Sequence, residues 1–195
     1  MVAIVFGIQG VGKSSVVNGV LKNNSSFSKL WWGKDTLELA MREGLAKDID
    51  DVRNLSVEKQ RGLQKKIGLQ YEKLIKENSD KNYIIETHAA LKTPQGFFPG
   101  FSPEIIAQLK PEVLFVIESH AIDIYHRRIL DESRRRDHDK TVREIQLNLD
   151  ATRWYASTMS VISGASLLMV ENVEDNLHIA VDKILDVLQK YQEAQ

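Results

Sequence analysis

The residues with the clearest chemical signature are Gly7-Ile8-Gln9-Gly10-Val11-Gly12-Lys13-Ser14, which follow the pattern G-x-x-x-x-G-K-S. An apolar run, Val2–Phe6, precedes them and a helical pattern follows, which is the context of a phosphate-binding loop. Glycines let the backbone turn tightly, and the following helix directs its positive end at phosphate oxygens. Lys13 can reach the outer phosphates and Ser14 can coordinate Mg²⁺. A chance glycine-rich turn is the alternative, but the full pattern predicts a nucleoside triphosphate site.

Two carboxylates follow apolar runs that read as buried strands. Glu86 ends the run Tyr83–Ile85, and Glu118 ends the run Val113–Ile117. Carboxyl ends of parallel strands meet at one edge of a sheet, so both side chains are expected beside the phosphate-binding loop. There they could hold Mg²⁺ through its water molecules. The alternative is that each carboxylate caps the helix that follows it.

A charged segment carries an unusual density of arginine. Guanidinium groups suit phosphate oxygens because they are planar and forked, and phosphoryl transfer needs positive charge around the moving group. A solvated helix and loop with local ion pairs is the alternative, while interleaved acidic residues disfavour a nucleic-acid site. In a chain with a phosphate-binding loop, the segment fits a lid that closes over the triphosphate and excludes water. The arginines are Arg127, Arg128, Arg134, Arg135 and Arg136.

Several isolated residues allow two interpretations each. Arg53 and Arg153 lie on or near predicted helices, where a surface position is the ordinary role of arginine. His88 could contact a nucleotide or satisfy the backbone. Trp31 and Trp32 could fill a core or stack on a base, and filling a core is the commoner role.

Strand and helix patterns alternate along the chain. This alternation predicts an α/β fold with a parallel sheet covered by helices on both faces. The predicted strands are Val2–Phe6, Phe27–Trp32, Tyr83–Glu86, Val113–Ile117 and Ser166–Val170. Helices are predicted at Ser14–Asn23, over much of Lys34–Asn78 with a stop at Gly44 and a start at Ser56, from Ser102-Pro103 to Lys110, and at Ile122–Leu130, Thr141–Ser163 and Glu174–Tyr191. Thr93–Gly100 is rich in turn formers and is predicted to be a loop.

Composition narrows the class of protein. A length of 195 residues suits one domain, and 43% hydrophobic residues allow a packed core. The net charge of −1 gives no general attraction to nucleic acid or anionic lipid. The absence of cysteine excludes disulfides and thiolate metal sites. No stretch is long enough for a membrane span, and the apolar start is too short for a signal peptide. We therefore expect a cytoplasmic protein without nucleic-acid or membrane partners.

Taken in order, these motifs resemble those of archaeal-type adenylate kinases, and the resemblance spans nearly the whole chain. The phosphate-binding loop is shared by many proteins, whereas the Thr-His strand end followed by Lys-Thr-Pro-x-Gly is much more specific. The matching residues are Gly7–Ser15, Gly33, Thr36, Glu43–Leu45, Asp51–Leu55, Glu86–His88, Lys92–Phe97, Glu118–Ser119, Arg127–Arg128, Arg134–Asp137, Arg153 and Ser163–Ala165.

The resemblance implies a reversible reaction in which MgATP and AMP give two ADP. Lys13 is implied to follow the moving phosphoryl group, and Arg53 to clamp the AMP phosphate. The implied ATP-binding residues are Gly7, Ile8, Gln9, Gly10, Val11, Gly12, Lys13, Ser14 and Ser15. The implied AMP-binding residues are Gly33, Thr36, Arg53, His88, Lys92 and Gly96, and the implied charge-neutralising residues are Arg128, Arg134, Arg136 and Arg153. Magnesium is assigned to Ser14 and, through water, to Glu86 and Glu118.

The resemblance also implies an organisation and an assembly. The expected fold is that of P-loop NTPases, with five parallel strands in a single kinase domain over residues 1–195. Residues of about 33–60 and 88–100 are expected to form the acceptor-nucleotide region, and about 130–140 a short lid. Members of the family associate as trimers, so a homo-oligomer is expected.

The chain departs from the family pattern in several places. Glu86 stands where the family often has aspartate, and the longer side chain could change how a magnesium-bound water is held. Ser119 replaces a threonine after the later carboxylate, and Phe27–Trp32 matches poorly. The lid has no cysteine, so it cannot bind zinc through thiolates.

Two other functions share part of this pattern. A kinase for another nucleoside monophosphate uses the same phosphate chemistry and differs only in its contacts to the acceptor base. A P-loop ATPase that acts as a conformational switch needs a water-activating carboxylate instead of an acceptor pocket, a role for which Glu86 is the candidate.

Overall fold

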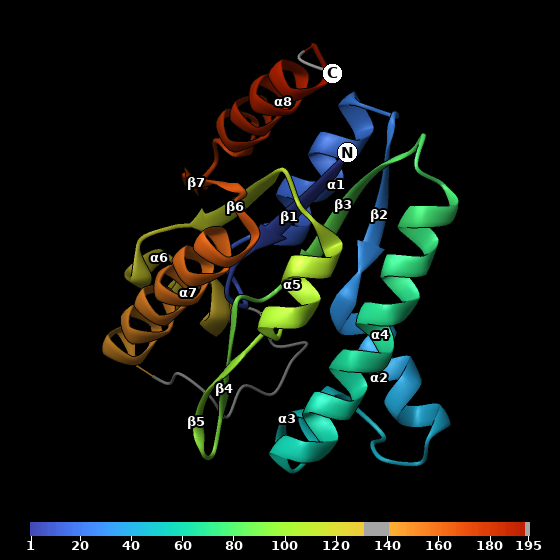
Figure 1. Ribbon diagram of the computed structural model, residues 1–195. Helices are drawn as coiled ribbons and strands as arrows, with labels where there is room; N and C mark the ends of the chain where they lie inside the picture. Colours follow the sequence, from blue (N-terminus) through green and yellow to red (C-terminus); the bar gives the residue numbers. More distant parts are fainter. Residues whose placement is uncertain (131–140, 194–195) are drawn as a thin grey trace.

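Five parallel strands form one sheet in the order β2-β3-β1-β6-β7 (Figure 1). The computed structural model describes residues 1–130 and 141–193. The strands of this sheet are β1 (Val2–Phe6), β2 (Phe27–Trp31), β3 (Asn82–Thr87), β6 (Val113–Glu118) and β7 (Ser166–Glu171). The central strands are continuous apolar runs because helices cover the sheet on both sides. The predicted α/β class and the five-stranded parallel sheet are confirmed.

Strand β1 lies between β3 and β6, the strands that carry Glu86 and Glu118 near their carboxyl ends. Its residue Val5 pairs with Glu86 of β3, and Phe6 pairs with Val116 of β6. The phosphate-binding loop leaves the end of β1 and leads into α1 (Lys13–Asn23). The sheet therefore brings the loop and both strand ends to one edge, where ligands bind in open α/β sheets.

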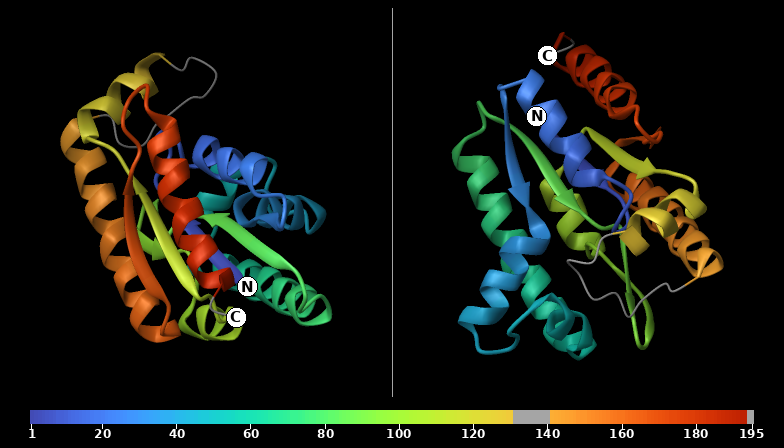
Figure 2. Two further views of the ribbon diagram at one scale, coloured as in Figure 1. Left: turned by 90° about the horizontal axis from the view of Figure 1, so that it is seen from above. Right: turned by 180° about the vertical axis from the view of Figure 1, so that it is seen from behind.

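Helices cover both faces of the sheet (Figure 2), and a hydrophobic cluster lies on each face. On one face, α1 and α8 (Leu177–Glu193) lie side by side and pack against β1, β3 and β6. On the other face, helices from the middle of the chain cover the same strands. These helices are α2 (Trp32–Arg42), α4 (Val57–Glu77), α5 (Pro103–Leu109) and much of α7 (Val142–Ser163), and α6 (Ala121–Leu130) packs against α7.

Local capping chemistry sets several helix ends. Ser56 accepts a hydrogen bond from the Lys59 backbone and begins α4, as its sequence position predicts. Thr141 and Glu144 form a reciprocal capping box at the start of α7. Gly164 ends α7 with a φ of 73°, a left-handed conformation that glycine adopts without strain. These side chains explain why the helix limits could be placed from sequence.

The segment predicted as mostly helical contains three separate helices. After α2, the chain turns at Gly44, and a short helix, α3 (Ile49–Asn54), precedes α4. Asp48 begins α3 because its carboxylate accepts hydrogen bonds from the backbones of Asp50 and Asp51. This arrangement places α3 and the start of α4 beside the open end of the sheet.

The predicted loop at Thr93–Gly100 was wrong. This region forms an antiparallel hairpin of β4 (Ala90–Thr93) and β5 (Gly96–Pro99), which extends from the same end of the molecule as α3 (Figure 1). Gln64 of α4 donates hydrogen bonds to the carbonyl oxygens of Pro99 and Gly100 and so ties the hairpin base to the helical layer. The turn formers occupy the hairpin's tip and exit, which is why they suggested a loop.

Smaller differences lie at element ends. The last helix begins at Leu177 rather than Glu174, because residues 172–176 form a tight connection after β7. Strand β2 ends at Trp31, one residue before the predicted end, and Trp32 begins α2. The predicted lid at residues 131–140 lies outside the described residues.

Candidate active site

A cavity of about 1050 Å³ opens at the carboxyl end of the sheet and joins the phosphate-binding loop to the helical segment that follows β2. Its lining includes most residues predicted for the two nucleotides. The predicted residues that line it are Ile8, Gln9, Gly10, Gly12, Lys13, Ser14, Ser15, Gly33, Thr36, Arg53, Glu86 and His88. One continuous space therefore reaches both groups of predicted residues.

The conformation of the phosphate-binding loop depends on glycine at two positions. Gly10 and Gly12 have φ values of 85° and 87°, which side-chain-bearing residues rarely adopt. A Cβ atom on Gly12 would lie 2.2 Å from Asn172 Nδ2, and one on Gly10 would lie 3.1 Å from Arg128 Cγ. Both glycines thus allow neighbouring side chains to press against the loop and fix its shape.

Lys13 is the first residue of α1 and is 8% exposed. Its Nζ atom lies 3.8 Å from Glu86 Oε1. Burial lowers the pKa of Lys13 from 10.5 to about 8, while Glu86 acts in the opposite direction and Lys29 adds to the lowering. The charged form of Lys13 is therefore costly without a ligand, and phosphate oxygens in the cavity would stabilise it.

Glu86 is almost fully buried and connects the loop to the neighbouring strands. Its Oε1 atom accepts a hydrogen bond from Ser14 Oγ at 2.5 Å. Its Oε2 atom has no hydrogen bond of good geometry but lies 2.5 Å from Lys29 Nζ on β2. The carboxylate thus lies between the helix that follows the loop and a lysine that was not among the predicted site residues.

The oxygen atoms of Ser14 and Glu86 fit a magnesium ion that arrives with a nucleotide. Because Ser14 donates its proton to Glu86, the lone pairs of Ser14 Oγ remain available to a cation. Among residues 1–130 and 141–193, no group of three acidic, histidine or cysteine side chains could hold a metal ion by itself. Such a pattern suits Mg²⁺, which usually keeps several waters and binds through one or two protein oxygens plus substrate phosphates.

Glu118, the other predicted metal-binding carboxylate, makes a forked ion pair with a predicted catalytic arginine. Arg153 Nε donates to Glu118 Oε1 at 2.5 Å, and Arg153 Nη2 donates to Glu118 Oε2 at 3.1 Å. Arg153 Nη1 also donates to Asp150 at 3.0 Å. Hydrogen bonding to Glu118 raises the pKa of Arg153, so this side chain stays charged. The magnesium role of Glu118 and the phosphate role of Arg153 remain predictions.

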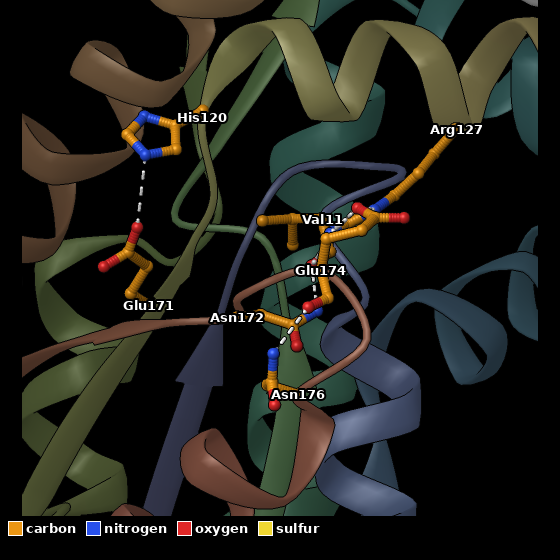
Figure 3. Close-up of polar contacts among 7 residues, drawn as sticks. All are labelled: Val11, His120, Arg127, Glu171, Asn172, Glu174 and Asn176. Carbon is orange, nitrogen blue, oxygen red and sulfur yellow. Dashed lines mark hydrogen bonds and ion pairs between the residues drawn. The ribbon is translucent and has the colours of Figure 1, made fainter.

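Two arginines of α6 contact backbone carbonyl oxygens of the phosphate-binding loop. Arg128 Nε and Nη2 donate to the carbonyl oxygen of Gln9 at 3.0 and 2.6 Å. Arg127 binds Glu174 through Nε and Nη2, and its Nη1 lies 3.5 Å from the carbonyl oxygen of Val11 (Figure 3). Arg128 therefore binds the backbone of the loop, and its predicted charge-neutralising role stays a prediction.

The connection after β7 also contacts the loop. Asn172 is buried, and its Nδ2 atom donates to the Val11 carbonyl oxygen at 2.8 Å (Figure 3). The Asn172 backbone in turn donates to the Glu118 carbonyl oxygen at 2.7 Å. Nearby, Asn176 donates to the Glu174 backbone, and His120 Nε2 lies 3.5 Å from Glu171. Asn172 thereby links the loop to the edge of the sheet.

His88 lies directly after β3 and lines the cavity. Burial lowers the pKa of His88 well below its ordinary value, and the positive charges of Lys13 and Arg53 lower it further. A hydrogen bond to the Gly7 backbone opposes this effect. The imidazole is therefore neutral at pH 7, and it satisfies the backbone while it faces the cavity.

The acceptor side of the cavity is formed by α2, α3 and the start of α4. Arg53 lines the cavity, and its Nη1 donates to Asp50 Oδ1 at 3.0 Å. Gln60 fixes the backbone here through hydrogen bonds to the carbonyl oxygens of Arg53 and Leu55. Thr36 is buried, and its hydroxyl donates to the Trp32 carbonyl oxygen. Arg53 is thus held at the cavity wall by one ion pair that an anionic ligand could replace.

Other predicted residues lie away from the cavity lining or outside the described residues. Lys92 lies on β4, with Nζ 3.6 Å from Glu144, and Gly96 lies at the hairpin turn. Arg134 and Arg136 lie outside the described residues. Within residues 1–130 and 141–193, the placed residues not among those that line the cavity are Gly7, Val11, Lys92, Gly96, Glu118, Arg128 and Arg153.

Comparison with known proteins identifies the family. The chain is 31% identical over 188 residues to the adenylate kinase of Methanopyrus kandleri, and the alignment covers 96% of this chain and 97% of that protein. It is 33% identical over 189 residues to the adenylate kinase of Methanothermobacter thermautotrophicus, with 96% and 99% coverage. The chain belongs to the adenylate kinase family. The enzyme is therefore a phosphotransferase of the nucleoside monophosphate kinase class, as the sequence motifs implied.

Two further comparisons agree with this assignment. The family described as "AAA domain" matches residues 6–146 of the enzyme, so the chain belongs to that family as well. A gluconokinase from Sinorhizobium meliloti superposes with a TM-score of 0.58 at 13% identity and covers 98% of this chain and 93% of its own. A shikimate kinase from Bacteroides thetaiotaomicron superposes with a TM-score of 0.57 at 13% identity, with 97% and 98% coverage. These two structures confirm the P-loop kinase fold.

Sequence reasoning missed several residues of the enzyme's site. Lys29 and Asn172 contact the loop or its carboxylate from distant parts of the chain, and Glu174 binds Arg127 beside the loop. Trp31, for which stacking on a base was the less common interpretation, is 45% exposed and lines the cavity. Trp32 also lines the cavity but is 5% exposed and fills the core, as predicted. Trp31 lies two residues after Lys29 on β2, so alternation along the strand was the available signal. Among the described helices, none has the length and apolar character needed to cross a membrane.

Proposed function

We propose that the enzyme transfers the γ-phosphoryl group of MgATP to AMP and forms two ADP, reversibly. One observation carries the proposal: a single cavity of about 1050 Å³ is lined both by the phosphate-binding loop and by Arg53 and its neighbours. In-line transfer requires the donor and acceptor phosphates to meet in one space from which water can be excluded. A cavity that joins the two sides meets this requirement.

The proposed reaction gives each group a stated task. An oxygen of the AMP phosphate attacks the γ-phosphorus, and the bond between that phosphorus and the bridging oxygen of ADP breaks. The backbone of Gly7–Ser15 holds the ATP phosphates through its N–H groups at the start of α1. Lys13 and arginines around the cavity stabilise the charge on the moving group, while Arg53 holds the AMP phosphate.

Magnesium is part of the proposal. The Ser14 hydroxyl would coordinate the ion, and Glu86 would accept hydrogen bonds from its waters. When bound, Mg²⁺ neutralises charge on the β- and γ-phosphates. Glu118 is proposed as a further outer contact, although Arg153 holds it in the described structure.

The acceptor region and the lid complete the proposed organisation. We assign residues of about 33–60 and 88–100 to the acceptor side because α2, α3 and the β4–β5 hairpin base lie along the cavity. The lid assignment to residues 130–140, with Arg134 and Arg136 as charge-neutralising groups, rests on the family resemblance. A trimeric assembly and a cytoplasmic location belong to the proposal on the same ground.

An acceptor panel tests the proposal. Phosphoryl transfer from MgATP to AMP, GMP, CMP and UMP should show a clear preference for AMP, and preference for another base would overturn the acceptor assignment. The conformational-switch alternative needs a carboxylate that activates water. In that case ATP hydrolysis would proceed without AMP, and no phosphoryl group would reach AMP.

A further inference from the structure

Lys29 contacts the carboxylate of Glu86, the group that would accept hydrogen bonds from magnesium-bound water in the proposed function. Oε1 accepts the hydrogen bond from Ser14, so Oε2 is the oxygen that remains for a water of the metal shell. This oxygen is buried, has no hydrogen bond of good geometry, and lies 2.5 Å from Lys29 Nζ. Lys29 therefore lies at the carboxylate oxygen that does not bind Ser14, while Lys13 Nζ lies 3.8 Å from the other oxygen.

The fold holds Lys29 in this position from several directions. In the parallel register, Lys29 and Trp31 of β2 pair with Ile84 and Glu86 of β3, so all four side chains lie on the face that packs against α1. Lys29 Nζ lies 3.4 Å from Asn18 Oδ1 on α1 and 4.7 Å from the centre of the Trp31 ring. The side chain of Lys29 is 20% exposed, so it is partly screened from water.

Two alternative partners are thus available if Lys29 leaves Glu86. Asn18 offers an acceptor oxygen, and the Trp31 ring offers a face that attracts a cation. Ser14 and Asn18 lie four residues apart on α1, so a short movement of the ammonium group along the helix suffices. The contact between Lys29 and Glu86 can be given up without leaving the lysine unpartnered.

We propose that Lys29 is a positioning residue that serves as the counter-ion of Glu86 in the nucleotide-free enzyme and keeps divalent cations from this site until a nucleotide brings them. A buried carboxylate without a counter-ion attracts a divalent cation strongly, whereas a carboxylate paired with lysine does not. The metal ion therefore binds together with the triphosphate and not before it. When the two bind, Lys29 moves away from Glu86 Oε2. The inference rests on the proposed magnesium role of Glu86.

Binding of Mn²⁺ to the nucleotide-free full chain, measured by the loss of its free EPR signal, tests the inference. Lys29→Met and Lys29→Gln should bind Mn²⁺ at least about 10-fold more tightly than the wild type, because Glu86 loses the nearer of its two lysine partners. Lys22→Met removes an exposed lysine of α1 and should behave as the wild type. Lys29→Met combined with Glu86→Gln should lose the gain, and Mg²⁺ should displace Mn²⁺ in the single variants.

The outcomes separate the inference from a merely structural role of Lys29. Unchanged Mn²⁺ affinity in both single variants, or a gain that persists in the double variant, overturns the inference. If the single variants do not fold in metal-free buffer, Mg²⁺ should restore their far-ultraviolet circular dichroism, and failure of Mg²⁺ to do so also overturns it. No step of the experiment uses AMP, so a failed acceptor panel leaves this result interpretable.

Discussion

The guanidinium of Arg153 donates hydrogen bonds of 2.5 and 3.1 Å to the two carboxylate oxygens of Glu118, so the two charges neutralise each other. The pair lies at the carboxyl end of the sheet. Arg153 comes from α7 and Glu118 from the end of β6, so the pair fixes the helix to the strand end. If Arg153 neutralises phosphate charge during transfer, it must replace at least one of its hydrogen bonds to Glu118 with a hydrogen bond to a phosphate oxygen. The pair is therefore a structural link between α7 and β6, and under the proposed function its arginine would also serve the phosphates.

This relationship predicts the effect of changing Arg153. Arg153→Ala should lower kcat by about 10²-fold, the usual cost of removing one charge-stabilising donor, and should lower Tm because Glu118 loses its partner. Arg153→Lys keeps the charge but not the fork, so it should restore Tm more than kcat. Steady-state kinetics and thermal unfolding measure the two effects. Wild-type turnover in Arg153→Ala would show that this arginine acts only in folding.

The lowered pKa of Lys13 predicts an alkaline limit for nucleotide capture. Because this pKa is about 8 without ligand, kcat/KM for ATP should fall above about pH 8 as the lysine loses its proton. The fall in kcat should lie at higher pH, since bound phosphates favour the charged form. The measurement is a pH series of both parameters between about pH 7 and 10.

The control for this series is Lys13→Arg, which keeps a charge at every pH used. Its residual kcat/KM should lack the alkaline fall, and a fall identical to that of the wild type would assign the limit to another group. A stability effect accompanies the lowered pKa. Between about pH 8 and pH 10.5 the unfolded chain binds more protons than the folded one, so Lys13 makes folding relatively more favourable as the pH rises.

Burial of neutral His88 predicts a loss of stability in acid. Its pKa in the folded chain lies well below the ordinary 6.5, so the unfolded chain gains the proton first as the pH falls through that value. Between pH 7 and pH 5 this residue can lower the free energy of unfolding by up to about 2 kcal/mol. Urea unfolding at the two pH values measures the loss. His88→Gln should show a smaller loss than the wild type, and an equal loss would exclude His88 as its source.

The position of Arg53 predicts a selective effect on the acceptor. Arg53→Ala should raise KM for AMP by about 10-fold or more and change KM for ATP much less, because the side chain lies on the acceptor wall of the cavity. Arg42→Ala, which removes an exposed arginine at the end of α2, should change neither value. Equal increases for both nucleotides would place Arg53 at a shared part of the site.

Much of the fold followed from local patterns. The strands around the loop are continuous apolar runs, and Ser56, Thr141 and Gly164 mark helix ends by their own capping chemistry. The β4–β5 hairpin did not follow, because its two short strands include Pro99 and Gly96, which are typical of loops. Short elements stabilised by distant partners, such as Gln64 at the hairpin base, carry little local signal.

The residues of the site likewise include some that local sequence predicts and some that it does not. The spacing from Gly7 to Ser14 identified the phosphate-binding loop, because that chemistry depends on consecutive residues. Lys29 and Asn172 contact the loop or its carboxylate because the sheet brings together segments that are far apart in sequence. Their roles depend on strand register and on which side chains meet across elements. Such contacts cannot be predicted from a single sequence.

The most direct test of the central claim is the stoichiometry of phosphoryl transfer from MgATP to AMP, followed by ³¹P NMR. The account predicts that ATP and AMP disappear together, that two ADP form for each pair consumed, and that the signals return toward ATP and AMP when pure ADP and Mg²⁺ are supplied. Release of inorganic phosphate at a rate independent of AMP would contradict it.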